Sequence, residues 1–283
     1  MIYIAPGGNR AICNGRAGPA WSDDEPVLPS GAVRHIADAD RRGVDQGRSG
    51  LGDACAAPWP ARAGPIAAVI FDLDGVLVDT EIWWDEVRRA FAHQHGRPWT
   101  ADDRAAVMGA NSRQWSRTMA QRLALDVPPP AIECAIVDGM VERWRTQPSP
   151  LIPGALDTVR RLSRHYPLAV ASSAHPAVIE AALSTTGLRP AFRVVVSSDE
   201  VEHGKPAPDV YLAAALRLGV PAGDCLVVED SLNGVLAGRA AGMTVALVPN
   251  LSIPPAAGAV EAADLVVPDL ASLEPALLAG PGA

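Results

Sequence analysis

The fold is decided by residues 66–80, which read IAAVIFDLDGVLVDT and join an apolar run to a pair of carboxylates. Residues 66–71 carry no polar side chain, as is typical of a strand buried on both faces of a parallel sheet. Asp72 and Asp74 follow this strand, and Gly75 follows them. Because ligands of open parallel sheets bind at the carboxyl ends of strands, both carboxylates can turn into a binding crevice. The alternative is that they only cap a turn.

The rest of the chain repeats a pattern of strands and helices. Further apolar runs lie at residues 168–171, 192–196, 225–228, 244–248 and 265–267. Segments with helical spacing or glycine stops lie at residues 155–165, 176–187, 208–219, 232–242 and 272–278. Strands that alternate with helices predict an α/β fold, a Rossmann-like parallel sheet with helices on both faces.

Residues 81–149 interrupt this alternation, because they contain no strand-like run. We expect three or four helices here, and helical patterns place three of them, at residues 81–95, 112–125 and 131–145. We therefore predict a helical domain at residues 81–149, inserted into a core made of residues 64–80 and 150–283. Residues 1–63 lack apolar periodicity and are rich in Gly, Ala, Pro, Arg and Asp, which predicts a disordered extension.

The composition of the chain argues against several classes of binding partner and indicates a cell compartment. The formal net charge of −8 argues against a nucleic-acid-binding surface. The sequence contains no run of eighteen apolar residues, so we predict no membrane span. None of the four cysteines forms a CxxC pair, which argues against a zinc site or a disulfide framework. We expect a cytoplasmic protein that is a monomer or a weak homodimer and binds a small molecule.

Polar residues also follow other predicted strands. Ser172 and Ser173 end the run at 168–171, where a serine can bind an anion or simply cap the next helix. Lys205 is the only lysine in the chain and lies between Gly204 and Pro206. A compact ammonium suits phosphate, although most lysines lie in solvent.

An acidic pair, Glu229 and Asp230, follows the run at 225–228. Carboxylate oxygens suit Mg²⁺, which also takes phosphate oxygens as ligands. The alternative is an acidic first turn of a helix, which accounts less well for Glu229 than for Asp230.

In chain order, these groups resemble the four motifs of the haloacid dehalogenase (HAD) superfamily. The matching groups are Asp72-Leu-Asp74-Gly75, Ser172, Gly204-Lys205-Pro206 and Glu229-Asp230-Ser231. The resemblance covers residues 66–278. Within the superfamily, the motif sequences resemble those of the beta-phosphoglucomutase-like group, in which a helical cap follows the first motif.

The resemblance implies a Mg²⁺-dependent phosphoryl transfer through an aspartyl-phosphate. Asp72 would be the nucleophile, and Asp74 would be the general acid and base. The phosphate ligands would be Ser172, Ser173 and Lys205. The metal ligands would be Asp72, Asp74, Glu229 and Asp230.

In the cap, residues 109–113 resemble the substrate loop of this group. Gly109, Ser112 and Arg113 are therefore substrate candidates, and the family's phosphate-binding arginine falls on Ser112 or, with a shift of one residue, on Arg113. Trp84 occupies the place of a histidine that assists the acid in beta-phosphoglucomutases. Because tryptophan cannot titrate, we expect Trp83 and Trp84 to pack between cap and core or to line the substrate site.

The leading hypothesis is a Mg²⁺-dependent phosphatase for a small phosphorylated metabolite, a sugar or polyol phosphate. A phosphosugar mutase is the first alternative, and Trp84 counts against it. A catalytically idle binding protein on the same fold is the second. The nucleophile-plus-acid pair counts against it, because a binding role needs no such pair.

Overall fold

The computed structural model describes residues 65–250 and 252–273. The predicted extension at residues 1–63 lies outside this range, as does most of the helix predicted at 272–278. The described part of that helix belongs to a short 3-10 turn, Leu270–Ser272.

The predicted parallel sheet is confirmed. Six strands lie in the order β3-β2-β1-β4-β5-β6, and every neighbouring pair is parallel. Their bounds are β1 Ala68–Phe71, β2 Leu168–Ser172, β3 Phe192–Ser197, β4 Cys225–Glu229, β5 Thr244–Leu247 and β6 Leu265–Val266. Because β1 lies between β2 and β4, the ends of these three strands meet at the centre of one sheet edge.

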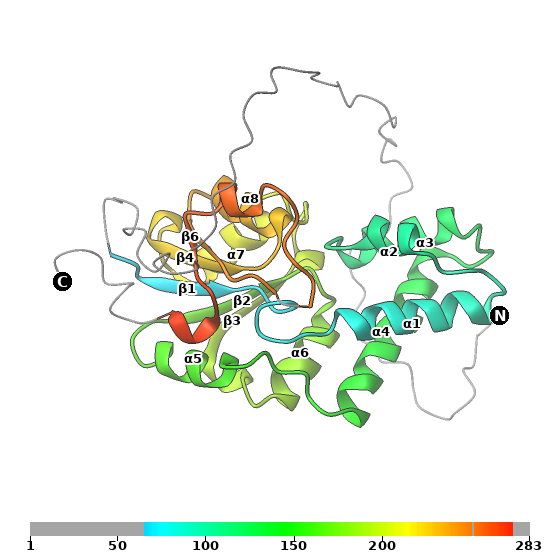
Figure 1. Cartoon of the computed structure of the whole chain (residues 1–283), viewed down its shortest axis with the longest axis horizontal. Coiled ribbons are helices and arrows are strands. Elements are labelled where there is room, and N and C mark those ends of the chain that lie inside the picture. Colours follow the sequence, from blue (N-terminus) through cyan, green and yellow to red (C-terminus); the bar gives the residue numbers. More distant parts are fainter. Residues whose placement is uncertain (1–64, 251, 274–283) are drawn as a thin grey trace, which may run out of the picture. The chain divides into compact units, whose positions relative to one another are not determined.

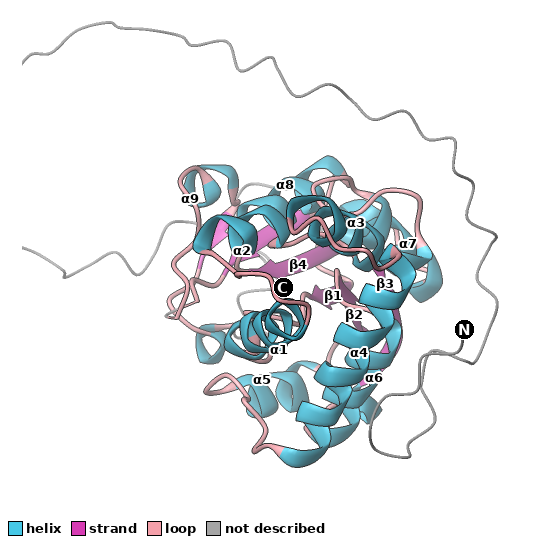
Figure 2. Cartoon of the chain, turned by 90° about the vertical axis from the view of Figure 1, so that its right-hand side faces the viewer, coloured by secondary structure: helices cyan, strands magenta, loops and turns pink. Residues whose placement is uncertain are grey.

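The strands are apolar because both faces of the sheet are covered. Val69 and Phe71 of β1 join one hydrophobic cluster, while Ala68 and Ile70 join another on the opposite face. Figure 2 shows α7 and α8 on one side of the strands and α5 and α6 on the other. These helices are α5 Ala155–Leu162, α6 Pro176–Thr185, α7 Asp209–Leu218 and α8 Leu232–Ala240, and a short α9, Ala259–Ala262, follows.

The segment between β1 and α5 is helical, as its pattern predicts. It contains α1 Glu81–Gln94, α2 Ala101–Val107, α3 Ser112–Arg122 and α4 Pro129–Thr146, which lie together beyond the carboxyl end of β1 (Figure 1). That residues 81–149 form a separate cap domain stays a prediction. The apolar cluster on one face of the sheet continues into this segment through Trp115, Ile136 and Met140.

Helix α2 is absent from the segments that the sequence pattern predicts. It is held by a capping box, in which the Thr100 hydroxyl accepts a hydrogen bond from the backbone N–H of Asp103 and the Asp103 carboxylate accepts one from the backbone N–H of Thr100. Seven residues are too few for apolar periodicity to reveal, so the capping pair was the available signal. None of the helices within residues 65–250 and 252–273 combines the length and apolar character needed to cross a membrane.

Candidate active site

A cavity of about 420 Å³ lies at the carboxyl edge of the central strands. The helical segment contributes Glu81, Ala105, Met108 and Gly109 to its walls. Every residue that the sequence predicts for the core site lines this cavity: Asp72, Asp74, Ser172, Ser173, Lys205, Glu229 and Asp230. The strand order explains this convergence, because β2, β1 and β4 are neighbours.

Lys205 is buried at the centre of the site. Its Nζ donates hydrogen bonds to Asp72 Oδ1 over 2.5 Å, to Glu229 Oε1 over 2.7 Å and to the Ala171 carbonyl over 3.1 Å. Burial opposes its charge, but the carboxylates of Asp72 and Glu229 prevail and raise the pKa of Lys205 well above its usual range. The ammonium is therefore a fixed positive charge beside the predicted nucleophile.

Asp72 is a strongly perturbed carboxyl. Burial raises its pKa to about 8, Lys205 opposes the shift, and the charges of Glu229 and Asp74 add to it. Lys205 donates to its Oδ1, and no described residue donates a hydrogen bond to its Oδ2. A cation at the site would keep Asp72 ionised at neutral pH.

Three carboxylates, those of Asp72, Glu229 and Asp230, come close enough for one oxygen of each to contact a single cation. Burial, and then the charges of Glu229 and Asp72, raise the pKa of Asp230 well above its usual range. Gly75 has a φ of +93°, and a Cβ there would lie 2.0 Å from Asp230 Oδ2. A side chain at position 75 would therefore displace the Asp230 carboxylate from this position. Oxygen ligands and excess negative charge fit Mg²⁺.

Glu229 is already fully engaged by protein donors. Its Oε1 accepts from Lys205 and from the Tyr211 hydroxyl over 2.8 Å, and its Oε2 accepts from the backbone N–H groups of Asp230 and Ser231. These bonds fix Glu229 as the partner that orients Lys205. Asp72 and Asp230 are consequently better placed than Glu229 to contact a metal directly. The sequence pattern gave no sign of the part played by Tyr211.

Asp74 is held by groups from both sides of the cavity. Thr80 donates its hydroxyl to Asp74 Oδ1, and the Trp84 indole donates to the same oxygen over 3.2 Å. Ser172 Oγ lies 3.5 Å from Asp74 Oδ2 and also accepts from the Ala174 N–H over 3.0 Å. Ser172 therefore lies in the site but does not cap the next helix, because the N-cap of α6 is His175, whose ring nitrogen accepts from the Ala177 N–H.

Trp84 was expected only to pack or to line the site, and its contact with Asp74 was missed. Its ring also packs edge-on against Trp115, while Trp83 packs against Trp144 within the helical segment. The missed signal was position: Trp84 lies one helical turn after Thr80, and residues four apart share a helix face.

The predicted substrate loop is only partly at the cavity. Gly109 lines it, but Ser112 and Arg113 do not. The Ser112 backbone N–H donates to Asp199 Oδ1 over 2.9 Å, and Arg113 donates to the Asp199 carbonyl over 2.7 Å. In this arrangement nothing supports a contact between Arg113 and a second phosphate, because its guanidinium is directed to the core.

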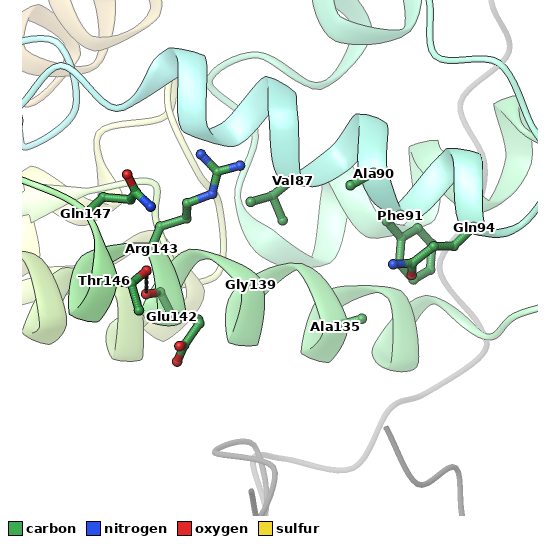
Figure 3. Close-up of a pocket in the computed structure, with 10 residues that line it drawn as sticks. All are labelled: Val87, Ala90, Phe91, Gln94, Ala135, Gly139, Glu142, Arg143, Thr146 and Gln147. Atoms are coloured by element: carbon green, nitrogen blue, oxygen red, sulfur yellow. Dashed lines mark hydrogen bonds between the residues drawn. The ribbon is translucent and has the colours of Figure 1, made fainter. Parts of the chain in front are cut away.

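A second hollow, of about 500 Å³, lies between α1 and α4 and is drawn in Figure 3. Its floor is tight, because a Cβ at Gly139 would lie 2.8 Å from Val87. Its polar lining residues are Gln94 at the end of α1 and Glu142, Arg143, Thr146 and Gln147 at the carboxyl end of α4, and they include no nucleophile paired with an acid. The cavity at the strand ends, which does hold such groups, is therefore the candidate active site.

The chain is similar to several known proteins. The bifunctional riboflavin kinase/FMN phosphatase of Arabidopsis thaliana is 33% identical over 65% of this chain, which spans only about half (49%) of that protein. Fructose-1-phosphate phosphatase YqaB of Escherichia coli (strain K12) is 32% identical over 62% of this chain and 93% of its own length. The crystal structure of CbbY from Rhodobacter sphaeroides with phosphate has a TM-score of 0.67 and 27% identity, and the match covers 75% of this chain and 99% of that one.

The family comparison is the broadest of these findings. A model of the haloacid dehalogenase-like hydrolases matches residues 66–242. This range contains all seven core residues at the cavity, from Asp72 to Asp230. Since the match spans more than half of the chain, the protein belongs to the haloacid dehalogenase-like hydrolases.

Proposed function

We propose that this protein is a Mg²⁺-dependent phosphatase that acts on a small phosphorylated metabolite, a sugar or polyol phosphate, through an aspartyl-phosphate on Asp72. The observation that carries the proposal is the pairing of Asp72 with Lys205 over 2.5 Å beside Asp74 in one cavity. Two of the relatives named above are phosphatases of a sugar phosphate and of FMN, which supports phosphate-ester hydrolysis.

In the first step, an Asp72 carboxylate oxygen attacks phosphorus and the bond from phosphorus to the substrate oxygen breaks. Asp74 donates its proton to that leaving oxygen, which departs as an alcohol. Lys205 and the Ser172 hydroxyl hold the phosphoryl oxygens and spread their charge. The Oδ2 atom of Asp72 suits the attack, because Lys205 contacts the other oxygen.

In the second step, Asp74 takes a proton from water as the water oxygen attacks phosphorus. The bond between phosphorus and Asp72 breaks, and inorganic phosphate leaves with the carboxylate restored. Asp72, Asp230 and the Asp74 backbone carbonyl would hold Mg²⁺, which supplies positive charge to the phosphoryl oxygens. Glu229 would contribute by holding Lys205 in place.

The mutase alternative is disfavoured by the group that contacts Asp74. A mutase must delay the attack of water on its aspartyl-phosphate until a second sugar hydroxyl arrives. At Trp84 the contact is an indole N–H, which cannot titrate. We therefore expect water to hydrolyse the aspartyl-phosphate before a second sugar hydroxyl can attack it.

The test measures phosphate release by the full chain from a panel of sugar and polyol phosphates, with Mg²⁺, with EDTA and with Ca²⁺. We expect release with Mg²⁺, none with EDTA, and inhibition by Ca²⁺, whose larger and looser shell disturbs the in-line geometry. Phosphorus NMR follows glucose 1-phosphate and glucose 6-phosphate in parallel. Isomerisation faster than release would favour the mutase, and neither reaction on any substrate would favour the idle protein.

A further inference from the structure

The cavity has two chemically different ends. Asp72, Ser172 and Lys205 form the phosphoryl end at the strand termini. The opposite wall comes from the helical segment and carries one charged group, Glu81, beside the apolar or small residues Ala105, Met108 and Gly109. A substrate with its phosphorus at Asp72 can direct its leaving group toward this wall.

Glu81 lies next to the place where the leaving oxygen is protonated. It is the first residue of α1 and follows Thr80, whose hydroxyl binds Asp74. Since Asp74 protonates the leaving oxygen in the proposed mechanism, the Glu81 carboxylate is positioned to meet neighbouring groups of the same fragment.

The Glu81 carboxylate is short of hydrogen-bond donors. Its Oε1 is buried and has no partner among the described residues. Burial raises the pKa of Glu81, while the charge of Arg88 opposes the shift. A buried carboxylate oxygen without a donor is unfavourable, and substrate hydroxyls would supply the missing donors.

Nearby cations do not neutralise Glu81 directly. Arg88 stacks over the rings of Trp84 and Trp115, 4.9 Å and 5.4 Å from their centroids. Arg104 is exposed on α2. Among the described residues neither arginine pairs with Glu81 within 4.0 Å or lines the cavity, and Lys205, which does line it, is held by Asp72 and Glu229. The leaving-group wall thus presents one carboxylate to the cavity, and no arginine of the described helical segment lines the cavity to bind a second anion.

We propose that Glu81 is a specificity-determining residue that selects phosphate monoesters with a neutral, hydroxyl-bearing leaving group. It accepts hydrogen bonds from the hydroxyls and repels a second phosphate or a carboxylate. This inference rests on the proposed phosphatase function, and its test separates the two.

The test uses two substrates that differ only at the selected group. 2-Hydroxyethyl phosphate ends in a hydroxyl, and phosphoglycolate replaces that end with a carboxylate. Wild-type enzyme should favour 2-hydroxyethyl phosphate in kcat/KM by about tenfold or more, the usual value of a hydrogen bond to a charged group. Glu81→Gln removes the charge with little change in shape, so it should shrink this preference by about tenfold.

A matched control lies on the same helix. Glu86 pairs with Arg143 away from the cavity, so Glu86→Gln should keep the wild-type preference. p-Nitrophenyl phosphate has neither a hydroxyl nor a carboxylate on its leaving group, and its hydrolysis by each variant reports that the site is folded and active. The preference is then compared only between active proteins.

Each result bears on one proposal. If wild-type enzyme with Mg²⁺ releases no phosphate from these three substrates or the metabolite panel, the phosphatase function fails. If it releases phosphate but does not prefer 2-hydroxyethyl phosphate, the role of Glu81 is refuted. An unchanged preference in an active Glu81→Gln enzyme refutes that role as well.

Discussion

Trp84 donates its indole N–H to Oδ1 of Asp74 over 3.2 Å, so a helix outside the sheet contacts the predicted acid directly. The ring is held by Trp115 at one edge and by the Arg88 guanidinium over its face. Asp74 thereby receives donors from Thr80 and Trp84 on one oxygen. Its orientation depends on the first turn of α1 as well as on the strand that precedes it.

Replacing Trp84 with Phe should lower kcat by about tenfold, because it removes one of the two hydrogen bonds that orient Asp74 through Oδ1 while keeping an aromatic ring. Trp83→Phe is the matched control, since Trp83 packs on Trp144 and makes no contact with Asp74. Steady-state phosphate release measures both variants. Equal losses in the two proteins would mean that the Trp84 contact contributes packing alone.

Loss of the nucleophile and loss of the acid should leave different residual activities. Asp72→Asn should abolish turnover and phosphoenzyme formation, because an amide does not attack phosphorus. Asp74→Asn should slow turnover by about 10²–10⁴-fold, the usual contribution of general acid–base catalysis, and leave the nucleophile intact. Rapid quench with labelled substrate detects the phosphoenzyme. Near-normal activity of Asp72→Asn would overturn the assignment.

The strand-end residues were predictable because their signals are local. Asp72, Ser172 and Glu229 each end a short apolar run, and parallel strands bring such ends to one edge without further information. Lys205 was conspicuous as the only lysine of the chain. The structure adds the reason for its position, a buried pairing with Asp72 and Glu229.

The contacts of the helical segment were not predictable in the same way. Whether Trp84 meets Asp74 or lines an apolar wall depends on how α1 is rotated over the sheet, which apolar periodicity leaves open. Arg113 was a substrate candidate by its place in the loop, yet it reaches Asp199, 86 residues further along the chain. Such pairings depend on tertiary packing, which short sequence motifs do not encode.

Lys205→Met should impair folding as well as activity. It keeps the apolar stem but removes the charge between Asp72 and Glu229, so two buried carboxylates lose their partner. Breaking a buried ion pair usually costs about 3–5 kcal/mol. Mg²⁺ should restore part of the loss, so we expect it to raise the melting temperature of the variant more than that of the wild type. Equal shifts would argue against a cation site beside Lys205.

Glu133 couples stability to pH where α4 meets the core. Burial, with a further contribution from the charge of Asp199, raises the pKa of Glu133 to about 7 from its ordinary 4.5, and Arg113 opposes the shift. His175 Nε2 lies 4.0 Å from Glu133 Oε1. Because burial lowers the pKa of His175, its ring carries little positive charge at neutral pH to stabilise the Glu133 carboxylate. The folded protein therefore holds the Glu133 proton more tightly than the unfolded chain does.

The sign of the effect follows from this difference. The stability that the protonated Glu133 contributes is fully present below pH 4.5 and is lost as pH rises through about 7. Glu133→Gln mimics the protonated form, so it should match the wild type near pH 5 and exceed it at pH 8. We expect a gain of about 1 kcal/mol, less than the full shift implies because water reaches part of the carboxyl. That gain corresponds to a rise of about 2–4 °C in melting temperature for a protein of this size.

Glu142→Gln, on the exposed face of the same helix, is the control and should change the melting temperature little at either pH. A Glu133→Gln protein with the same offset from wild type at both pH values would show that Glu133 does not titrate at this contact.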